Sequence, residues 1–584
     1  MSGIGAVLDI ANGALASASY GIDVTGHNIA NVNTVGYSRQ TPVQEAKEPV
    51  LYNGLLMGRG VTTSTVTRIS EQMIEDRLMM QGGDLAYTSE MEKYAKTLEG
   101  IFTESASTSV SSLLNDYWNL WHDVANNPSG AAERIALREG AALLSDQFQS
   151  LNGDLKQLAT DLTNAISPEV DKINQLTQEI AQLNNQIVGM EITGVANDLR
   201  DKRNTLTAEL AKSIDVKSFE QENGALTIVS AKGCTLVHQD SSYDINLGGV
   251  NGDRVEWRNS AGAVVDITDH ISSGRMGGWL EIRDEVLVKV QLDMDSLAGE
   301  FIWQTNQQHS QGIGLEAFGN LAGDHEAVAP AAAMGTAGSG MAYGDRIQDG
   351  SFQLWVYDMN DAVAVPGGTA ITIDADVTSL NDVAAQISGV DANISAAVVD
   401  GQLQISGANG YTFAFSDDSS GALAAMGVNG LFKGTNAGSI GFSDNIGTNS
   451  SKIAAARIQN DGTYSSGDNA NAISIMDLQL AETTITQWSC DRLSGNMQGS
   501  FRATIDEGYH AMAGSIGAVS AGISKENTFN EEMVNSTQQI RDSVSGVSLD
   551  EEMTNLIKFQ HAYSAAAKLI NTADEMMVTL LEVR

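Results

Sequence analysis

Apolar residues recur along the first thirty positions of the chain with spacings that alternate between four and three. The positions on this line are Ile4, Leu8, Ala11, Leu15, Ala18, Ile22, Thr25 and Ile29. Such an alternation keeps every member on one narrow stripe of an α-helix, which is the pattern of a coiled-coil seam. Because the stripe is narrow and rich in small residues, it suits packing against another helix better than filling a globular core.

The C-terminal end of the chain repeats the same pattern. Its stripe consists of Leu549, Met553, Leu556, Gln560, Tyr563, Ala567, Ile570, Asp574, Met577 and Leu581. Both ends are therefore predicted to be long helices, paired with each other as a coiled coil. The polar positions Gln560 and Asp574 have two interpretations. They either face solvent, or they lower the stability of the pair and fix its register and choice of partner.

Between the ends, helical and extended patterns alternate along the chain. A helical block is predicted over 85–215, with a clean seam from Ile173 to Met190. Short alternating runs predict strands at 225–231, 243–249, 254–262 and 263–269. A Gly/Ala-rich segment at 321–345 is interpreted as a linker, and further strands with one embedded helix follow it to about 460.

These patterns predict a multidomain α+β fold with paired terminal helices, a helical-bundle domain and a β-rich outer domain. The predicted domains are a terminal helix with an extended segment at 1–60, a helical rod domain at 61–320 with a small β subdomain near 215–270, an inserted variable β-rich domain at 321–460, return helices of the rod domain at 461–530, and a C-terminal coiled-coil helix at 531–584.

Composition and charge narrow the classes of function. The 584 residues include 33 basic and 73 acidic side chains, a formal charge of −40. Neither nucleic acid nor an anionic membrane is expected as a partner, because both require a basic surface. The apolar N-terminus has no basic segment before it and is interrupted by Asp9, Asn12 and Asp23, so it predicts neither a secretory signal peptide nor a membrane span. Cys234 and Cys490 form no disulfide framework, and whether they ever pair is left open.

No pattern in the sequence predicts catalysis or metal binding. His325 and Glu326 begin like a zinc motif, but position 329 is alanine where a second histidine would be needed. The run from Asp374 begins like a calcium loop, but Ser379 and Ala385 occupy the two discriminating positions, so a helix-capping turn is the better interpretation. We therefore expect no catalytic residues, no metal and no cofactor.

The stretch GHNIANVNTVGYSRQ, residues 26–40, lies where the first helix is expected to end. As plain structure, Asn31, Asn33 and Gly36 end the helix, since asparagine and glycine tolerate positive φ. As function, the turn fixes the direction in which the chain leaves the helical rod.

At these residues the sequence resembles the axial proteins of the bacterial flagellum, the family of rod, hook and hook-associated proteins. The motif has the general form A-N-x-x-T-x-G-Y, with Asn31, Thr34, Gly36 and Tyr37 as its motif turn, and Ser38-Arg39-Gln40 continues it. Val35 stands where family members often have proline. Three other stretches agree with hook-associated members, at 196–210, 274–287 and 545–570, whereas 320–460 shows only a general β-rich character.

The resemblance implies a structural subunit that joins hook to filament and is exported by the flagellar type III apparatus without a cleaved signal, to act outside the cell. It implies self-association in a helical or ring assembly, hook protein on one side, hook-associated protein 3 on the other, and an export chaperone at the C-terminal region. The expected assembly interface comprises Ile4, Leu8, Leu15, Ile22, Ile29, Leu549, Met553, Leu556, Tyr563, Ile570 and Met577.

Other functions remain open at this point. The chain could be the hook subunit or hook-associated protein 3, although the helical block at 85–215 argues against the hook subunit. From a different class, the inserted domain could be an adhesin or an enzyme on a structural stalk, but no catalytic constellation supports the enzyme.

Overall fold

A computed structural model describes residues 2–52, 55–102, 109–192, 194–230, 232–447 and 449–582. The chain divides into two compact units. The first unit comprises residues 1–94, 161–282 and 521–584, and the second comprises 95–160 and 283–520. Within the described residues, no helix is long and apolar enough to cross a membrane.

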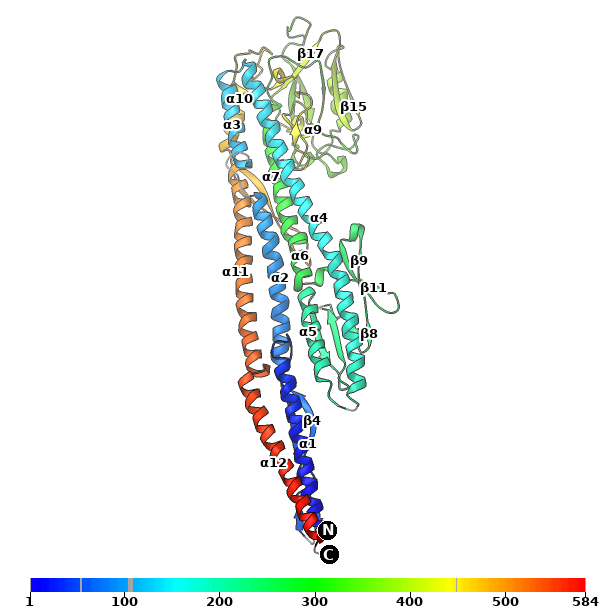
Figure 1. Cartoon of the computed structure of the whole chain (residues 1–584). Helices are drawn as coiled ribbons and strands as arrows, with labels where there is room; N and C mark the ends of the chain where they lie inside the picture. Colours follow the sequence, from blue (N-terminus) through cyan, green and yellow to red (C-terminus); the bar gives the residue numbers. More distant parts are fainter. Residues whose placement is uncertain are drawn as a thin grey trace. The chain divides into compact units, whose positions relative to one another are not determined.

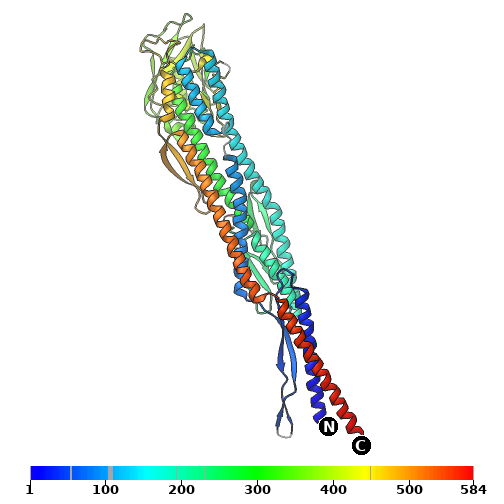
Figure 2. The same ribbon diagram turned by 60° about the vertical axis from the view of Figure 1, so that its left-hand side comes forward.

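The first unit is built on long helices that include both ends of the chain. Its helices are α1 (Ser2–Ala30), α5 (Asn197–Ser213), α6 (Gly274–Glu281) and α12 (Leu549–Glu582), with parts of α2 (Gln72–Phe102), α4 (Ala131–Met190) and α11 (Ile505–Ser545). Helices α1 and α12 lie side by side along their lengths (Figures 1 and 2). The two chain ends are thus in contact within the single chain, and their pairing as a coiled coil stays a prediction.

The strands of the first unit form small antiparallel sheets. They are β1 (Gln40–Ala46), β2 (Val50–Tyr52), β3 (Leu55–Met57), β4 (Val61–Arg68), β5 (Val216–Glu220), β6 (Leu226–Ser230), β7 (Thr235–His238), β8 (Ser241–Ser242), β9 (Ile245–Gly248), β10 (Arg254–Arg258) and β11 (Val264–Asp266). Strand β1 pairs with β4 and β2 with β3, while the others form sheets of order β5-β6-β7-β8 and β11-β10-β9. Strands thus occur at each place predicted between 225 and 269, although residue 231 of that prediction lies outside the described residues.

The seam predicted in the second half of α4 forms a buried line. Ile173, Ile180 and Ile187 are fully buried, as heptad spacing on one face requires. Met190, the last predicted member, is exposed. The helix continues through Pro168, whose missing N–H removes one backbone hydrogen bond without ending the helix.

The second unit combines helices with a β-rich region. Its helices are α3 (Val110–Asn126), α7 (Leu287–His309), α8 (Leu380–Ser388), α9 (Ala422–Met426) and α10 (Ala470–Met476), with the other parts of α2, α4 and α11. Its strands are β12 (Asn320–Ala322), β13 (Gly350–Tyr357), β14 (Thr369–Ile373), β15 (Ile394–Val399), β16 (Gln402–Gly407), β17 (Thr412–Ser416), β18 (Phe432–Lys433), β19 (Gly441–Phe442), β20 (Thr483–Ser489) and β21 (Met497–Ala503). The sheets have the orders β12-β16-β15, β14-β13-β17, β18-β19 and β20-β21.

Helices and β-rich region share one core in the second unit. The rings of Tyr117 and Phe301, from α3 and α7, lie 5.3 Å apart, and the rings of Phe301 and Phe432 lie 5.1 Å apart. Arg134 of α4 is buried and donates to the carbonyl of Ile453 at 2.6 Å. The β-rich region therefore completes the packing of the helices around it.

The interpretation of 321–345 as a linker is wrong. His325 is buried, with its ring nitrogens near the carbonyl oxygens of Ala425 and Gly434 at 3.0 and 3.2 Å, and Met334 and Tyr343 are buried too. Gly335 and Gly344 let backbone segments approach closely, since a Cβ atom on them would lie 2.6 Å from the Ala375 carbonyl oxygen and 2.5 Å from the Met334 carbonyl oxygen, respectively. By contrast, Ser379 and Asp382 form the capping box of α8, as the capping interpretation of that run predicts.

The prediction of return helices throughout 461–530 also needs correction. Only the short α10 precedes a β-hairpin, formed by β20 and β21, and the long helix α11 begins at Ile505. The hairpin is largely exposed, so its strands lack the strict alternation of buried and exposed positions from which sequence reasoning recognises a strand.

Candidate assembly site

The contact between α1 and α12 is lined by small residues. Ala11, Ala18 and Gly21 of α1 are buried, and a Cβ atom placed on Gly21 would lie 2.5 Å from the Phe559 ring of α12. On α12, Ala566 is buried in the same contact zone. Small side chains allow the two helix axes to approach closely, so this contact depends on shape more than on buried apolar area.

On α12 the buried line lies one position before the line expected from the sequence, whereas on α1 the predicted positions Ala11, Ala18 and Thr25 are buried. On α1, Ile4, Leu8, Leu15, Ile22 and Ile29 are half-buried. On α12, Leu556 and Ile570 are half-buried, while Leu549, Met553, Tyr563 and Met577 are exposed, as are Gln560 and Asp574. The most buried positions of α12 are Glu552, Ala566 and Ala573, which share a spacing that is a multiple of seven. The large apolar side chains of the predicted seam thus flank the pair and leave an apolar surface on α12.

A tight turn follows α1 at the predicted motif. The Tyr37 N–H donates to the Thr34 carbonyl at 3.2 Å, and Gly36 has a φ of +80°. Together these are the features of a type II β-turn with Val35 and Gly36 at its centre. A Cβ on Gly36 would also lie 2.3 Å from the Thr205 hydroxyl, so only glycine fits.

Asn31 acts through hydrogen bonds and not through positive φ. Its backbone N–H and its side-chain amide both donate to the His27 carbonyl, at 3.1 and 3.0 Å, and its side-chain oxygen accepts from the Thr34 hydroxyl at 3.1 Å. Of the residues in this turn, all of which the structure describes, Gly36 alone has positive φ. The expectation that Asn31 and Asn33 use positive φ to end the helix is therefore wrong.

Asn28 is the centre of a buried polar cluster behind this turn. Its side-chain oxygen accepts from the Tyr37 hydroxyl at 2.7 Å and the Gln40 N–H at 3.0 Å. Its amide donates to the Gln40 carbonyl at 2.9 Å and to Glu552 Oε2 at 3.1 Å. Every hydrogen-bonding position of the Asn28 amide is satisfied, as burial demands. Burial raises the pKa of the Tyr37 hydroxyl, and the carboxylates of Asp198, Asp201 and Glu552 raise it further, so Tyr37 remains a donor.

Glu552 connects this cluster to α12. It is 2% exposed, and its Oε1 lies 2.9 Å from Arg39 Nε. Arg39 also contacts the exposed neighbour Glu551 at 2.6 Å, and its N–H donates to the Ser545 carbonyl at 2.9 Å. One arginine of the motif thus holds both the start of α12 and the end of α11.

Asp201 of α5 holds the other side of the turn. One oxygen accepts from the Ser38 N–H at 2.8 Å and the other from Arg68 Nη1 of β4 at 2.7 Å. Gln40 donates to Asp198 at 2.6 Å, and Arg541 of α11 lies 3.3 Å from the Tyr37 carbonyl. The turn therefore fixes α1, β4, α5, α11 and α12 relative to one another. We call the cluster of Asn28, Tyr37, Arg39, Gln40, Asp201 and Glu552 the hinge cluster.

Sequence reasoning identified the turn but missed most of its partners. No local pattern indicates the role of Glu552, and Asp201 lies in the stretch 196–210 that resembles hook-associated members. The available signal was that the three stretches 26–40, 196–210 and 545–570 share one family resemblance, and the structure brings all three together. Among the described residues, no group of His, Cys, Asp or Glu could hold a metal ion.

Comparisons with known proteins agree with this arrangement. A family model described as the flagellar hook-associated protein FlgK helical domain matches residues 95–324. Models of the C-terminal part of flagellar basal body rod FlgEFG proteins and of flagella basal body rod proteins match 538–583 and 8–37. The last two matches cover most of α12 and α1, which form the paired ends.

Curated relatives are similar over nearly the whole chain. Flagellar hook-associated protein 1 of Salmonella typhimurium is 25% identical, and the match covers 98% of both chains. The proteins of that name from Escherichia coli and Bacillus subtilis are 26% and 24% identical, again over 98% of this chain and 98% and 96% of theirs. A solved structure, the flagellar hook junction protein FlgK from Burkholderia pseudomallei, has a similar fold, with a TM-score of 0.52 at 14% identity over 81% of this chain and 100% of that one.

Proposed function

Since the chain belongs to the family of flagellar hook-associated proteins, we propose that it forms the junction between hook and filament in the bacterial flagellum. The family is structural, and the chain is not an enzyme. The observation that carries the proposal is that the similarity to hook-associated protein 1 runs from end to end of both chains, terminal helices included.

The partners follow from the same proposal. The chain associates with other flagellar axial proteins through its terminal helices. More specifically, it assembles with copies of itself, contacts hook protein on one side and hook-associated protein 3 on the other, and is met by an export chaperone at its C-terminal region. It leaves the cell through the flagellar export apparatus and works outside.

The physical basis for assembly lies on α1 and α12. The apolar side chains exposed on α12, including Leu549, Met553 and Tyr563, are covered only when other helices pack against them. The hinge cluster meanwhile holds the helix pair in a fixed direction relative to α5 and α11. A rigid helix pair with an exposed apolar face is suited to pack into a helical array of similar helix pairs.

A deletion of the gene in the native bacterium tests this function. Cells should build hooks but no filaments, and filament subunits should accumulate in the medium. Loss of the hook itself would point to the hook subunit instead, and normal filaments would contradict the proposal. Expression of the full chain from a plasmid should restore filaments.

A further inference from the structure

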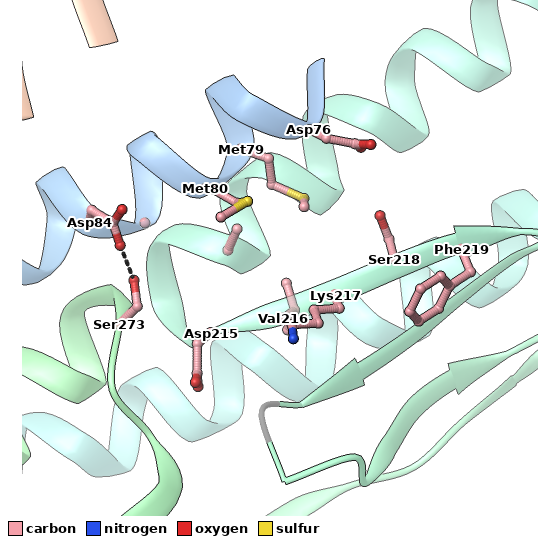
Figure 3. A pocket seen from close by; sticks show the side chains of 12 residues that line it. Asp76, Met79, Met80, Asp84, Asp215, Val216, Lys217, Ser218, Phe219 and Ser273 are labelled. Atoms are coloured by element: carbon pink, nitrogen blue, oxygen red, sulfur yellow. Dashed lines mark hydrogen bonds between the residues drawn. The ribbon is translucent and has the colours of Figure 1, made fainter. Parts of the chain in front are cut away.

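A groove between α2 and β5 of the first unit has no role in the proposed function. Its volume is about 340 Å³, and Met79, Met80, Val216 and Phe219 line it (Figure 3). Met80 and Phe219 are 63% and 58% exposed although both are large and apolar. Side chains of this kind at an open groove mark a contact with another molecule.

Strand β5 gives the groove a second property. It lies at the edge of the sheet β5-β6-β7-β8 and has a single strand neighbour, β6. An edge strand presents backbone N–H and C=O groups to which another extended segment can add. The groove therefore suits an extended segment with apolar side chains, which would hydrogen-bond to β5 and insert those side chains beside Met80.

Within the part of the chain that the structure describes, the same unit carries a segment of that kind that pairs with no further strand. The β2–β3 hairpin pairs Leu51 with Leu56 and Val50 with Met57. Leu51 and Leu56 are 68% and 71% exposed, and both strands of this two-stranded hairpin have a free edge. Figure 2 shows the hairpin projecting beside the ends of α1 and α12, and none of its described residues lines the groove.

Charge favours the same pairing. In a chain of formal charge −40, the segment 47–60 carries two basic residues, Lys47 and Arg59, against one acidic residue, Glu48. The groove is bordered by Asp76, Asp84 and Asp215 with one lysine, Lys217. Arg59 is already paired with Asp9 of α1 at 2.7 Å, so Lys47 is the basic side chain at the base of the hairpin that can face this acidic border.

We propose that the groove between α2 and β5 receives the β2–β3 hairpin of a second copy of this chain, so that the hairpin adds to β5 and its leucines pack against Met80 and Phe219. This inference rests on the proposed function, because it supplies a contact between copies in the junction. The proposed contact is separate from that of the terminal helices. Each copy contributes one hairpin to one neighbour and one groove to another, as a head-to-tail ring or helix requires.

Cross-linking between two differently tagged versions of the full chain tests the contact. Both versions carry Cys234→Ser and Cys490→Ser; one adds Leu56→Cys and the other Phe219→Cys. They are expressed together in the native bacterium in place of the wild-type chain, and isolated flagella are treated with a short bismaleimide. We expect part of the 61.7 kDa band to shift to a dimer band that carries both tags.

The control replaces Phe219→Cys by Val264→Cys, an exposed position on β11 of the same unit. Leu51→Cys serves as the second hairpin variant should Leu56→Cys fail to enter flagella. If flagella contain both versions and the mixed dimer is no stronger than in the control, the inference is wrong. Antibody labelling of the same flagella separates the two proposals. If the protein is at the hook–filament boundary but no cross-linked dimer forms, only the proposed hairpin contact is wrong. If the dimer forms but the protein lies elsewhere in the flagellum, only the proposed junction function is wrong.

Discussion

At the scale of single residues, Val35 is a position at which a substitution can raise the stability of the folded chain. It is the first central residue of the type II turn that ends in the Tyr37 N–H···Thr34 hydrogen bond, and proline is favoured there. We predict that Val35→Pro stabilises the first unit by about 0.4–1 kcal/mol by restricting the unfolded chain. Urea denaturation followed by circular dichroism measures this, and a lower midpoint would show that the turn has another backbone shape.

Glu552 and Glu551 form a matched pair for testing the hinge cluster. Both contact Arg39, but Glu552 is buried and also accepts from Asn28, whereas Glu551 is exposed. Glu552→Ala should cost about 3–5 kcal/mol, because it leaves buried partners unpaired. Glu551→Ala should cost about 0–1 kcal/mol.

Limited proteolysis of the full chain measures the difference. Glu552→Ala should expose a cleavage site near 546–552, at the junction of α11 and α12, and Glu551→Ala should leave the pattern unchanged. Equal patterns for the two variants would mean that the cluster does not hold α12.

His309 and Asp324 give the second unit opposing responses to acid. Burial lowers the pKa of His309 from 6.5 to about 4. Between pH 6.5 and 4 the unfolded chain therefore binds a proton at His309 that the folded chain does not, and stability falls as the pH drops through this range. Burial raises the pKa of Asp324 from 3.8 to about 6, so the folded chain keeps a proton and stability rises as the pH drops from 6 toward 3.8.

Asp324→Asn removes one of these responses. When the pH is lowered from 7.5 to 5, the free energy of unfolding of the wild-type chain should rise by about 1.4 kcal/mol relative to the variant. This is the effect of the one pH unit between the folded-state pKa of Asp324, about 6, and pH 5. Urea denaturation of both chains at the two pH values measures the difference. A difference of zero would mean that Asp324 titrates normally.

The turn at 26–40 could be predicted from the sequence because glycine and asparagine are typical of turns. No local pattern indicates the roles of Glu552 and Asp201, since these roles depend on partners far away in the chain. Sequence reasoning misjudged His325 for the same reason, because nothing local shows that two distant carbonyl groups will meet that ring.

At the scale of elements, the α1–α12 pair depends on glycine where the helices are closest. Gly21→Ala should place a Cβ against Phe559 and weaken the pair by about 1–3 kcal/mol, despite the better helix propensity of alanine. Gly26→Ala is the control, because nothing lies near its Cβ position, and it should gain up to about 1 kcal/mol.

Amide hydrogen exchange of the full chain measures the stability of the contact between α1 and α12. Amides of α1 and α12 should exchange faster in Gly21→Ala and no faster in Gly26→Ala than in the wild-type chain. Faster exchange in both, or in neither, would contradict the close contact at Gly21.

Periodicity predicted both terminal helices and the strands β6, β9, β10 and β11, but on α12 it placed the buried line one position away. Apolar residues spaced by three and four positions define the buried face of a helix only approximately. A prediction from this spacing also favours large apolar residues over small ones. In this pair the small residues Ala18 and Gly21 form the contact, and the larger Ile22 borders it.

At the scale of the whole molecule, the β-rich region cannot be treated as a removable insert. Buried groups of the helices, Arg134 and His309, depend on Ile453, Asn429 and Ala454 for their hydrogen bonds. We predict that replacing 325–455 by a short linker unfolds the second unit. Replacing the exposed hairpin tip 493–496 by an Asn-Gly turn is the control and should leave it folded.

Near-ultraviolet circular dichroism of both variants measures the outcome, because Tyr117 and Phe301 lose their fixed surroundings when the shared core is lost. A deletion variant with a native-like aromatic spectrum would show that the helices hold their own core. The sequence suggested a separate domain because composition changes near 320, yet a change of composition does not reveal which surfaces pack together.

The position of the protein in intact flagella tests the central claim most directly. Flagella of the native bacterium are labelled with gold-conjugated antibody against the full chain and viewed by electron microscopy. The junction role predicts label confined to a single band at the boundary between hook and filament. Label distributed along the hook or along the filament would contradict it.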